Sequence, residues 1–469
     1  TADRLIAEKI SRGDWRSHLG GSPSLFVNAA TWALLVSGRL VGDKAPDRHG
    51  LGAALGRLIA RGGEPLIRRG VDIAMRMLGQ QFVTGQTIDE ALQNGRANEG
   101  RGYRYSFDML GEAALTMADA DAYFRLYEQA IHAIGRASNG RGVRDGPGIS
   151  VKLSALHPRY SESQRQRVMA ELLPRLKQLV MLAKTYDIGI NIDAEEADRL
   201  ELSLDLLEAL AMDADTAGFD GIGFVAQAYK KRCPMLIDCI VALARRSGRR
   251  LMVRLVKGAY WDAEIKRAQA DGLPGYPVYT RKVYTDLCYL VCAERLLAAA
   301  DLVFPQFATH NALTLATVQA QAGRMGVTDY EFQCLHGMGE TLYDQLLADG
   351  GPGVPCRIYA PVGSHQTLLA YLVRRLLENG ANSSFVHQIV DQDVPLEQLL
   401  ADPVQAARQL GGAPHPGIPL PCDLYGPARR NAAGMDLGDP ATRLAIAPAL
   451  QAHGQMVRDA RALLAGAQV

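Results

Sequence analysis

Residues 188–256 read IGINIDAEEADRLELSLDLLEALAMDADTAGFDGIGFVAQAYKKRCPMLIDCIVALARRSGRRLMVRLV. This stretch contains three short β-type runs, Ile188–Asp193, Ile222–Ala226 and Leu251–Val256. The two segments between them, Glu201–Met212 and Lys231–Arg246, repeat apolar residues at the spacing of a helix that is buried on one face. Because a strand that returns parallel to its predecessor needs a long crossover, usually a helix, the stretch predicts a parallel sheet covered by helices.

The same alternation continues on both sides of this stretch. Further β-type runs lie at Tyr105–Leu110, Ile149–Leu153, Leu302–Ala308, Phe332–Leu335 and Arg357–Ala360. Further helical patterns lie at Ala120–Ser138, Ser163–Tyr186, Thr280–Ala300, Ala312–Ala322, Thr341–Ala348 and Thr367–Glu378. Eight alternations in one chain favour an α/β fold that closes into a (β/α)8, TIM-like barrel over an open sheet.

Composition changes at both ends of the predicted barrel. Residues 1–100 show helical spacing broken by Gly and Pro, so we expect an N-terminal helical region there. The barrel is expected over residues 101–390. Residues 391–469 are rich in Pro, Gly and Ala and are expected to form a C-terminal wrapping tail or linker, with a final helix from Pro448 to Leu464.

Charge and cysteine content limit the function classes. The chain has 51 basic and 50 acidic side chains, so its summed field does not favour nucleic acid or an anionic membrane. Its seven cysteines are scattered without CxxC spacing, which predicts neither a disulfide framework nor a zinc site. No run approaches the roughly 18 apolar residues of a membrane span, and the first residues lack the features of a signal peptide. We therefore expect a cytoplasmic protein.

In a barrel of this type the active site lies at the carboxyl ends of the strands, so the polar residues there are the first candidates. They are Lys152, Asp193, Gln227, Arg254, Lys257, His310, Gln333, His336 and Tyr359. Arg254 shares a strand face with Val256, and a buried Arg at this position needs an anionic or electron-rich partner. Two partners remain open for Arg254: an internal salt bridge to Asp193, or a ligand, which the other polar residues at the barrel mouth favour.

The segment after the eighth strand predicts a helix with one polar face. At 100° per residue, Tyr371, Arg374, Arg375 and Glu378 fall within an arc of about 100°. Two neighbouring guanidiniums suit a carboxylate or a phosphate because each offers a planar fork of donors. A solvated basic face is the alternative. The position of this helix, directly after the last strand and over the barrel mouth, favours ligand binding.

Several other patterns carry less information. No Gly-rich phosphate loop is present, and Asp193, Glu195 and Glu196 lack a matching His cluster, so no metal is expected. Cys288 and Cys292 share a helix face, which favours apolar packing over redox chemistry. His310 fits either a structural histidine bonded to the backbone or a ligand contact.

Long ordered motifs in the chain resemble a known family. They are Ile149–Tyr160, Ile190–Glu196, Arg254–Asp262, Tyr276–Lys282, Gln306–Asn311, Phe332–Gly337 and Tyr371–Asn379. These motifs closely resemble the proline dehydrogenase half of the bacterial bifunctional proline utilisation A family, over residues 4 to 430. The resemblance implies a (β/α)8 barrel with non-covalent FAD. It also implies oxidation of L-proline to Δ1-pyrroline-5-carboxylate by hydride transfer to flavin N5, the first step of proline catabolism to glutamate.

The resemblance also implies roles for individual residues. Arg374, Arg375 and Lys152 would hold the proline carboxylate, while Asp193 and Tyr260 would position them, and Arg254 would lie near flavin N5; these six form the expected catalytic set. Substrate would further contact Ala259, Leu335, Tyr359 and Tyr371. Besides Arg254 and Arg375, the FAD contacts would be Gln227, Val256, Lys257, Gly258, Trp261, Thr280, Arg281, Lys282, Thr309, His310, Gln333, Cys334, Glu378 and Ser384.

The family also implies partners. Electrons would pass to a membrane quinone, which implies peripheral contact with the inner face of the membrane. Relatives continue into an NAD-dependent aldehyde dehydrogenase that this chain, ending at Val469, does not include; we expect either a fragment of such a protein or a single-activity form. Some relatives begin with a DNA-binding domain, but the N-terminal helices, interpreted as neutral, predict no nucleic-acid partner.

Two other functions remain open from the residues alone. One is a different barrel enzyme, such as an aldolase or a metal-dependent hydrolase acting on a carboxylate. The other is a non-catalytic sensor or scaffold that binds a small acid.

Overall fold

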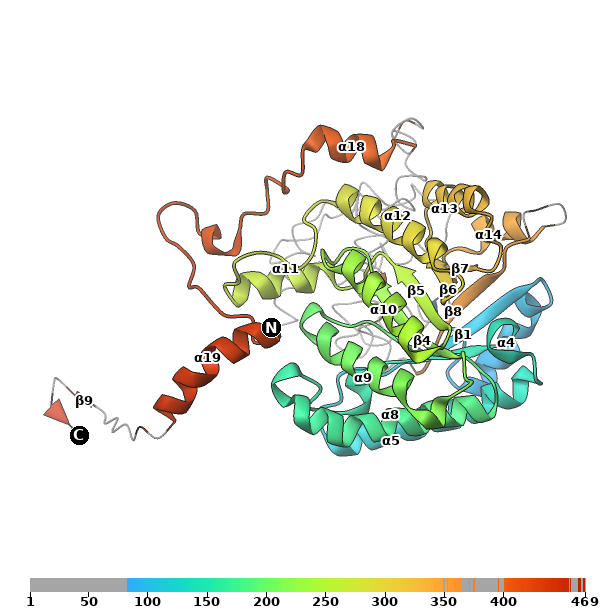
Figure 1. The fold of residues 1–469 in the computed structure, drawn as a ribbon, viewed down its shortest axis with the longest axis horizontal. Helices are drawn as coiled ribbons and strands as arrows, with labels where there is room; N and C mark the ends of the chain where they lie inside the picture. Colours follow the sequence, from blue (N-terminus) through green and yellow to red (C-terminus); the bar gives the residue numbers. More distant parts are fainter. Residues whose placement is uncertain are drawn as a thin grey trace, which may run out of the picture.

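The computed structural model describes residues 82–348, 351, 353–364, 371, 374–375, 395, 400–454, 456, 463–464 and 467–468. Its centre is a closed barrel of eight parallel strands in sequence order, in which β8 pairs with β1 (Figure 1). The strands are β1 Tyr103–Met109, β2 Gly148–Val151, β3 Ile190–Ile192, β4 Ile222–Gln227, β5 Leu251–Val256, β6 Val303–Ala308, β7 Glu331–Leu335 and β8 Cys356–Val362. The predicted (β/α)8 barrel is confirmed.

Seven long helices cover the barrel close to the predicted positions. They are α5 Met117–Ser138, α8 Arg165–Thr185, α9 Leu200–Met212, α10 Cys233–Ser247, α12 Lys282–Ala298, α13 Ala312–Met325 and α14 Glu340–Leu347. The helix α4 Ile88–Glu99 falls within residues 1–100, where the sequence predicted helices, whereas α11 Trp261–Ala270 and α18 Pro403–Leu410 were not predicted. Shorter turns are α6 Gly142–Asp145, α7 Leu153–Leu156, η2 Glu162–Gln164, η3 Ala197–Arg199, η4 Ala214–Thr216 and η5 Pro421–Asp423.

Along the strands, apolar residues of the hydrophobic core alternate with buried polar residues: Phe107 lies between Ser106 and Asp108, and Leu255 follows Arg254. An ion pair closes the interior towards the amino ends of the strands. Glu331 accepts hydrogen bonds from Arg357 Nε at 2.7 Å and from the amides of Gln306 and Gln333, both at 2.8 Å. Arg357 also donates to the backbone oxygen of Tyr105 at 3.0 Å. The Glu331 carboxylate and the Arg357 guanidinium are thus paired with each other and with neighbouring polar groups, so the interior here is a packed floor below the mouth and not a pore.

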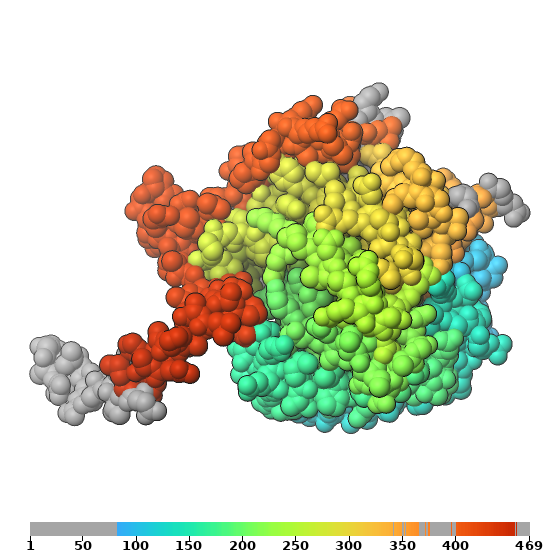
Figure 2. All heavy atoms as spheres, in the orientation of Figure 1, coloured from blue at the N-terminus to red at the C-terminus, as the bar shows by residue number. Residues whose placement is uncertain are grey.

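The C-terminal tail wraps along the barrel over α11 and α12, as predicted (Figures 1 and 2). Tyr276 donates to the Pro419 oxygen at 2.6 Å, and Gly434 N donates to the Gly272 oxygen at 2.9 Å. Gly272 has a φ of 63°, and a Cβ at this residue would lie 1.9 Å from the Ala432 oxygen. A glycine is therefore required where the tail crosses this loop.

The predicted terminal helix is wrong in position. The structure has α19 at Pro440–His453, and β9 Leu463–Leu464 pairs antiparallel with β10 Ala467–Gln468. The helix begins early because the Asp439 carboxylate accepts hydrogen bonds from Ala441 N and Thr442 N, with Pro440 in the first turn. In the late helix Tyr371, Arg374 and Arg375 are helical as predicted. Three predictions fall outside the described residues: the N-terminal helices up to residue 81, Glu378 and Ser384.

Candidate active site

The carboxyl ends of the strands bring four predicted residues into one buried network. Lys152 follows β2, Asp193 follows β3, Arg254 is in β5 and Tyr359 is in β8. The Tyr359 hydroxyl donates to Asp193 Oδ2 at 2.7 Å, and Lys152 Nζ lies 3.4 Å from both that oxygen and the hydroxyl. The sequence therefore identified side chains that contact one another although more than 200 residues separate Lys152 from Tyr359.

Arg254 is held from two sides. Its Nη1 donates to Asp193 Oδ1 at 3.0 Å, and its Nη2 donates to the hydroxyls of Ser150 at 3.0 Å and Ser106 at 3.2 Å. The guanidinium also lies over the Tyr359 ring, 5.2 Å from its centre. The internal salt bridge, the less favoured of the two partners considered for Arg254, is thus present. Arg254 Nε remains buried without a hydrogen-bond partner among the described residues.

A further carboxylate, Asp108 in β1, completes the charge balance of the network. Its Oδ2 accepts from Lys152 Nζ at 2.7 Å, and Asp108 is fully buried. Burial raises the pKa of Asp108, an effect that the charge of Lys152 opposes. Although burial disfavours the Lys152 ammonium, the negative charges of Asp108 and Asp193 raise its pKa well above the usual value. Two cations, Lys152 and Arg254, therefore face two carboxylates in a dry site.

The late helix contributes two guanidiniums to the rim. Arg374 lies over the Tyr260 ring and Arg375 over the Tyr371 ring, each 5.0 Å from the ring centre. Arg375 is only 5% exposed, so a solvated basic face is the wrong description of this helix. Tyr371 packs in an apolar cluster with Tyr359, which links the rim to the network below.

Arg374 has a carboxylate partner that the sequence reasoning missed. Glu112, just after β1, accepts from Arg374 Nη1 at 2.6 Å and from Nη2 at 2.9 Å. Burial would raise the pKa of Glu112, but the hydrogen bonds and charge of Arg374 lower it below its usual value. Asp108 and Glu112 could both have been found from sequence, because they end the first strand as the other candidates end theirs.

The residues expected to bind a cofactor divide into two groups. Five lie near the carboxyl ends of β4, β6 and β7: Gln227, Thr309, His310, Gln333 and Cys334. His310 Nε2 accepts from Leu335 N at 3.0 Å, as expected of a structural histidine. The Cys334 side chain lies in the main hydrophobic core with its Sγ 3.8 Å from that of Cys356, whereas Gln333 points towards Glu331.

The second group lies around α11 and α12. Lys257 and Lys282 both donate to Asp286, each at 2.5 Å. Thr280 Oγ1 accepts from His415 N at 3.0 Å, and Arg281 Nε donates to the Ala413 oxygen at 3.0 Å. The tail thus contacts Thr280 and Arg281, two of the residues predicted to bind FAD. Trp261 Nε1 donates to the Tyr279 oxygen at 2.8 Å. Of the remaining predicted residues, Ala259 is exposed, and three are half-buried: Val256, Gly258 and, at the end of β7, Leu335.

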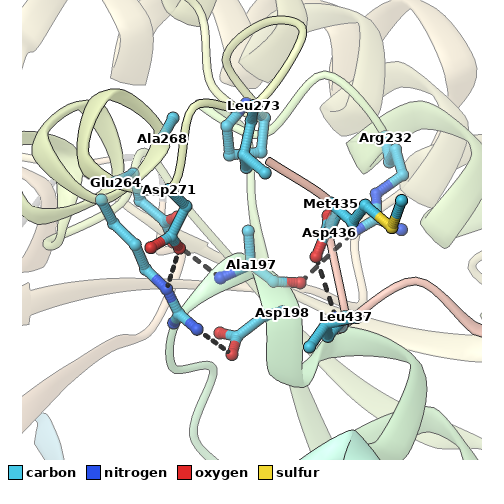
Figure 3. Close-up of a pocket in the computed structure, with 13 residues that line it drawn as sticks. Ala197, Asp198, Arg232, Glu264, Ala268, Asp271, Leu273, Met435, Asp436 and Leu437 are labelled. Atoms are coloured by element: carbon cyan, nitrogen blue, oxygen red, sulfur yellow. Dashed lines mark hydrogen bonds and ion pairs between the residues drawn. The ribbon is translucent and has the colours of Figure 1, made fainter. Parts of the chain in front are cut away.

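A separate cavity of about 310 Å³ lies between α11, the loop after β3 and tail residues 435–438 (Figure 3). Arg267 donates to Asp198 at 2.7 Å and lies 3.5 Å from Asp271. Arg232 donates to the Ala197 oxygen at 3.2 Å. The two arginines of the cavity are thus paired within its wall. None of the residues predicted for the active site lines this cavity. This cavity is distinct from the barrel mouth.

Among the described helices, none combines the length and the apolar character needed to cross a membrane.

Comparisons with known proteins match these features. Residues 91–388 match the family model described as proline dehydrogenase. The chain is 62% identical over 474 residues to "Bifunctional protein PutA" of Salmonella typhimurium, covering 99% of this chain and 36% of that protein. It is 64% identical over 460 residues to that of Escherichia coli, covering 96% and 35%. A crystal structure of a Bradyrhizobium japonicum proline utilization A mutant superposes with a TM-score of 0.75 at 50% identity, covering 98% and 46%. The chain spans about a third of the length of these curated relatives.

Residues 1–82 match a second model, described as the DNA-binding domain of proline dehydrogenase. That description runs against the expectation of no nucleic-acid partner. The expectation was based on treating the N-terminal helices as neutral, but residues 1–82 contain 12 Lys and Arg against 7 Asp and Glu, an excess of 5 basic residues. Residues 1–81 of this segment lie outside the described residues.

Proposed function

The chain belongs to the proline dehydrogenase family, and from this membership we propose that its barrel oxidises L-proline to Δ1-pyrroline-5-carboxylate with FAD as the hydride acceptor. The observation that carries the proposal is the pair Arg374 and Arg375 on the rim, above a buried network that is neutral when its four charged groups are ionised. Family membership also goes against an aldolase, a hydrolase or a non-catalytic sensor.

The rim suits an amino acid carboxylate. Arg374 already engages the Glu112 carboxylate with both prongs of its guanidinium, which supports carboxylate recognition at this position. Arg375 is buried against Tyr371, which places a second guanidinium in a site with little water. Tyr359 and Tyr371 share one apolar cluster and supply ring faces for a small saturated ring.

The network below would orient the reaction. Asp193 receives hydrogen bonds from Arg254 and Tyr359 and lies 3.4 Å from Lys152, so one carboxylate holds three neighbours in position. Their rotamers are restricted by burial, and little reorganisation is needed when a substrate enters. In our proposal Lys152 then supports the substrate carboxylate together with the two arginines.

The residues around the mouth fit a flavin. Gln227 Oε1, Gln333 Oε1 and Arg254 Nε are buried polar atoms without a hydrogen-bond partner among the described residues, and they lie on β4, β7 and β5. Gly258 has a φ of 132°, and a Cβ there would lie 2.3 Å from the Tyr229 ring, so the loop after β5 needs a glycine. Arg254, Lys257, Arg281 and Lys282 would supply positive charge for the pyrophosphate and for the reduced ring. When bound, FAD supplies the hydride acceptor.

The further steps also belong to the proposal. Electrons would pass from the flavin to a membrane quinone, from a cytoplasmic protein with peripheral contact at the inner face of the membrane. An aldehyde dehydrogenase module in a longer polypeptide would then complete the conversion to glutamate. The name of the relatives, bifunctional PutA, supports this arrangement.

A visible spectrum tests the core of the proposal. Purified protein should show flavin absorption, and L-proline added without oxygen should bleach it. D-proline and glycine serve as controls, because they lack the correct chirality or the ring. A colourless protein that also fails to bind added FAD would overturn the proposal, as would a flavin that L-proline does not reduce.

A further inference from the structure

Three cysteines far apart in the sequence meet behind the barrel wall. Cys233 begins α10, and Cys288 and Cys292 lie one turn apart on α12. Helices α10 and α12 pack side by side (Figure 1). All three side chains are buried, at 1%, 5% and 0% exposure. Cys233 and Cys288 are 55 residues apart, so the local spacing of cysteines did not indicate this cluster. The sequence analysis had favoured apolar packing of Cys288 with Cys292.

The sulfur positions match a metal-thiolate centre. Cys292 Sγ lies 3.6 Å from Cys233 Sγ and 3.9 Å from Cys288 Sγ, and all three atoms lie within 4.8 Å of one another. A tetrahedral zinc with Zn–S bonds of about 2.3 Å separates its sulfurs by about 3.8 Å. The three thiols therefore stand close to three corners of such a tetrahedron without rearrangement of either helix.

The surroundings add an outer-shell contact to the cluster. The Tyr279 hydroxyl hydrogen-bonds to Cys288, which is the kind of contact that orients a metal ligand.

We propose that Cys233, Cys288 and Cys292 bind one soft d10 cation of the Zn²⁺ class through three thiolates. The site ties α10 to α12 and is structural, because it lies behind the barrel wall and not among the mouth residues. Cys288 lies two residues after Asp286, which bonds Lys257 and Lys282, so the site also steadies this part of α12. This proposal departs from the expectation of no metal, which was based on the spacing of Cys and His along the sequence.

Cadmium binding tests the site in the full chain, kept reduced by a phosphine and studied as purified. Cd²⁺ serves as the probe because its bonds to thiolates give a charge-transfer band in the ultraviolet. The variant is Cys292→Ser, which removes the central sulfur. The matched control is Cys239→Ser, because Cys239 is an exposed cysteine on the same helix, α10.

Wild type and Cys239→Ser should bind about one Cd²⁺ per chain with this band, and Cys292→Ser should bind it at least about tenfold more weakly. Absence of the band in wild type, or equal affinity in the folded Cys292→Ser variant, would overturn the proposal. If that variant does not fold, thiol labelling of wild type replaces it, at a urea concentration that exposes these buried thiols to the reagent: Cd²⁺ should protect three cysteines from labelling. Unchanged labelling would overturn the proposal as well.

Discussion

Glu112 and Arg374 form a two-pronged ion pair at the barrel mouth, with both guanidinium nitrogens at 2.6 and 2.9 Å from the two carboxylate oxygens. The pair joins the loop after β1 to the late helix, so it couples two walls of the proposed substrate site. Arg374 is 17% and Glu112 26% exposed, and the geometry is bidentate, so the pair is stronger than an ordinary surface ion pair.

We expect Glu112→Ala to weaken proline binding. Arg374 would keep its contact with the Tyr260 ring but lose the carboxylate that aims its planar fork. Loss of such positioning should raise the KM for proline by about 5- to 30-fold, equivalent to about 1–2 kcal/mol, with flavin content unchanged. Steady-state kinetics measure it. Glu112→Gln, which retains one acceptor oxygen, should fall between the two proteins. A KM at or below the wild-type value would show instead that Glu112 competes with proline for Arg374.

Removing the charge of Arg375 should cost more. Arg375→Met keeps much of the side-chain volume over Tyr371 but leaves a substrate carboxylate in a dry site without a guanidinium. We expect proline binding to weaken by about 2–5 kcal/mol. Equilibrium titration with a non-oxidisable proline analogue, followed by flavin absorption, gives the affinity. Arg136→Met, at an exposed position on α5, is the control for loss of one positive charge. Equal affinities for all three proteins would contradict the carboxylate role.

Sequence reasoning predicted the barrel because each strand is a short apolar run and each crossover is a periodic helix. It predicted that Lys152, Asp193 and Tyr359 lie at one mouth because the carboxyl ends of parallel strands meet there. It missed Asp108 as a site residue. Asp108 lies inside the predicted run Tyr105–Leu110, so it was treated as part of the strand and not as a polar residue at the strand's end.

Tertiary contacts were the other source of error. Arg254 was expected to favour a ligand, but Asp193, Ser106 and Ser150 converge on it only in the closed barrel. The three-cysteine cluster depends on the packing of α10 against α12, which no local pattern shows. The error in α19 was avoidable, since Asp439-Pro440 is a common helix start.

The barrel floor predicts a specific acid sensitivity. Burial would raise the pKa of Glu331, but the charge and hydrogen bonds of Arg357 lower it overall. Because the pKa of Glu331 is lower in the folded protein than the usual value of 4.5, its ionised carboxylate stabilises the fold above that pH. This stabilisation is lost as the pH falls from 4.5 through the pKa of the folded protein. Wild type should therefore become less stable progressively below about pH 4.5.

Glu331→Gln should reveal this contribution by difference. At pH 7 the variant leaves Arg357 buried without its carboxylate and should be destabilised by about 3–5 kcal/mol. The gap from wild type should narrow as pH falls, because Glu331 is then protonated in wild type as well. Urea unfolding followed by circular dichroism at several pH values measures both. Glu128→Gln, at an exposed position on α5, is the control; a gap that stays constant with pH would rule out the charge of Glu331 as the cause.

The tail crossing at Gly272 offers a way to detach the tail without touching the mouth. A Cβ in Gly272→Ala would lie 1.9 Å from the backbone oxygen of Ala432, at a φ of 63° that costs an L-residue about 1 kcal/mol in addition. Because the contacting atom is backbone, the tail itself must move. Gly275→Ala is the matched control on the same loop, since a Cβ there meets nothing within 4 Å. We expect trypsin to cleave at Arg429 and Arg430 several-fold faster in Gly272→Ala than in wild type or Gly275→Ala. Equal cleavage rates in the three proteins would mean that the tail is not held at this crossing.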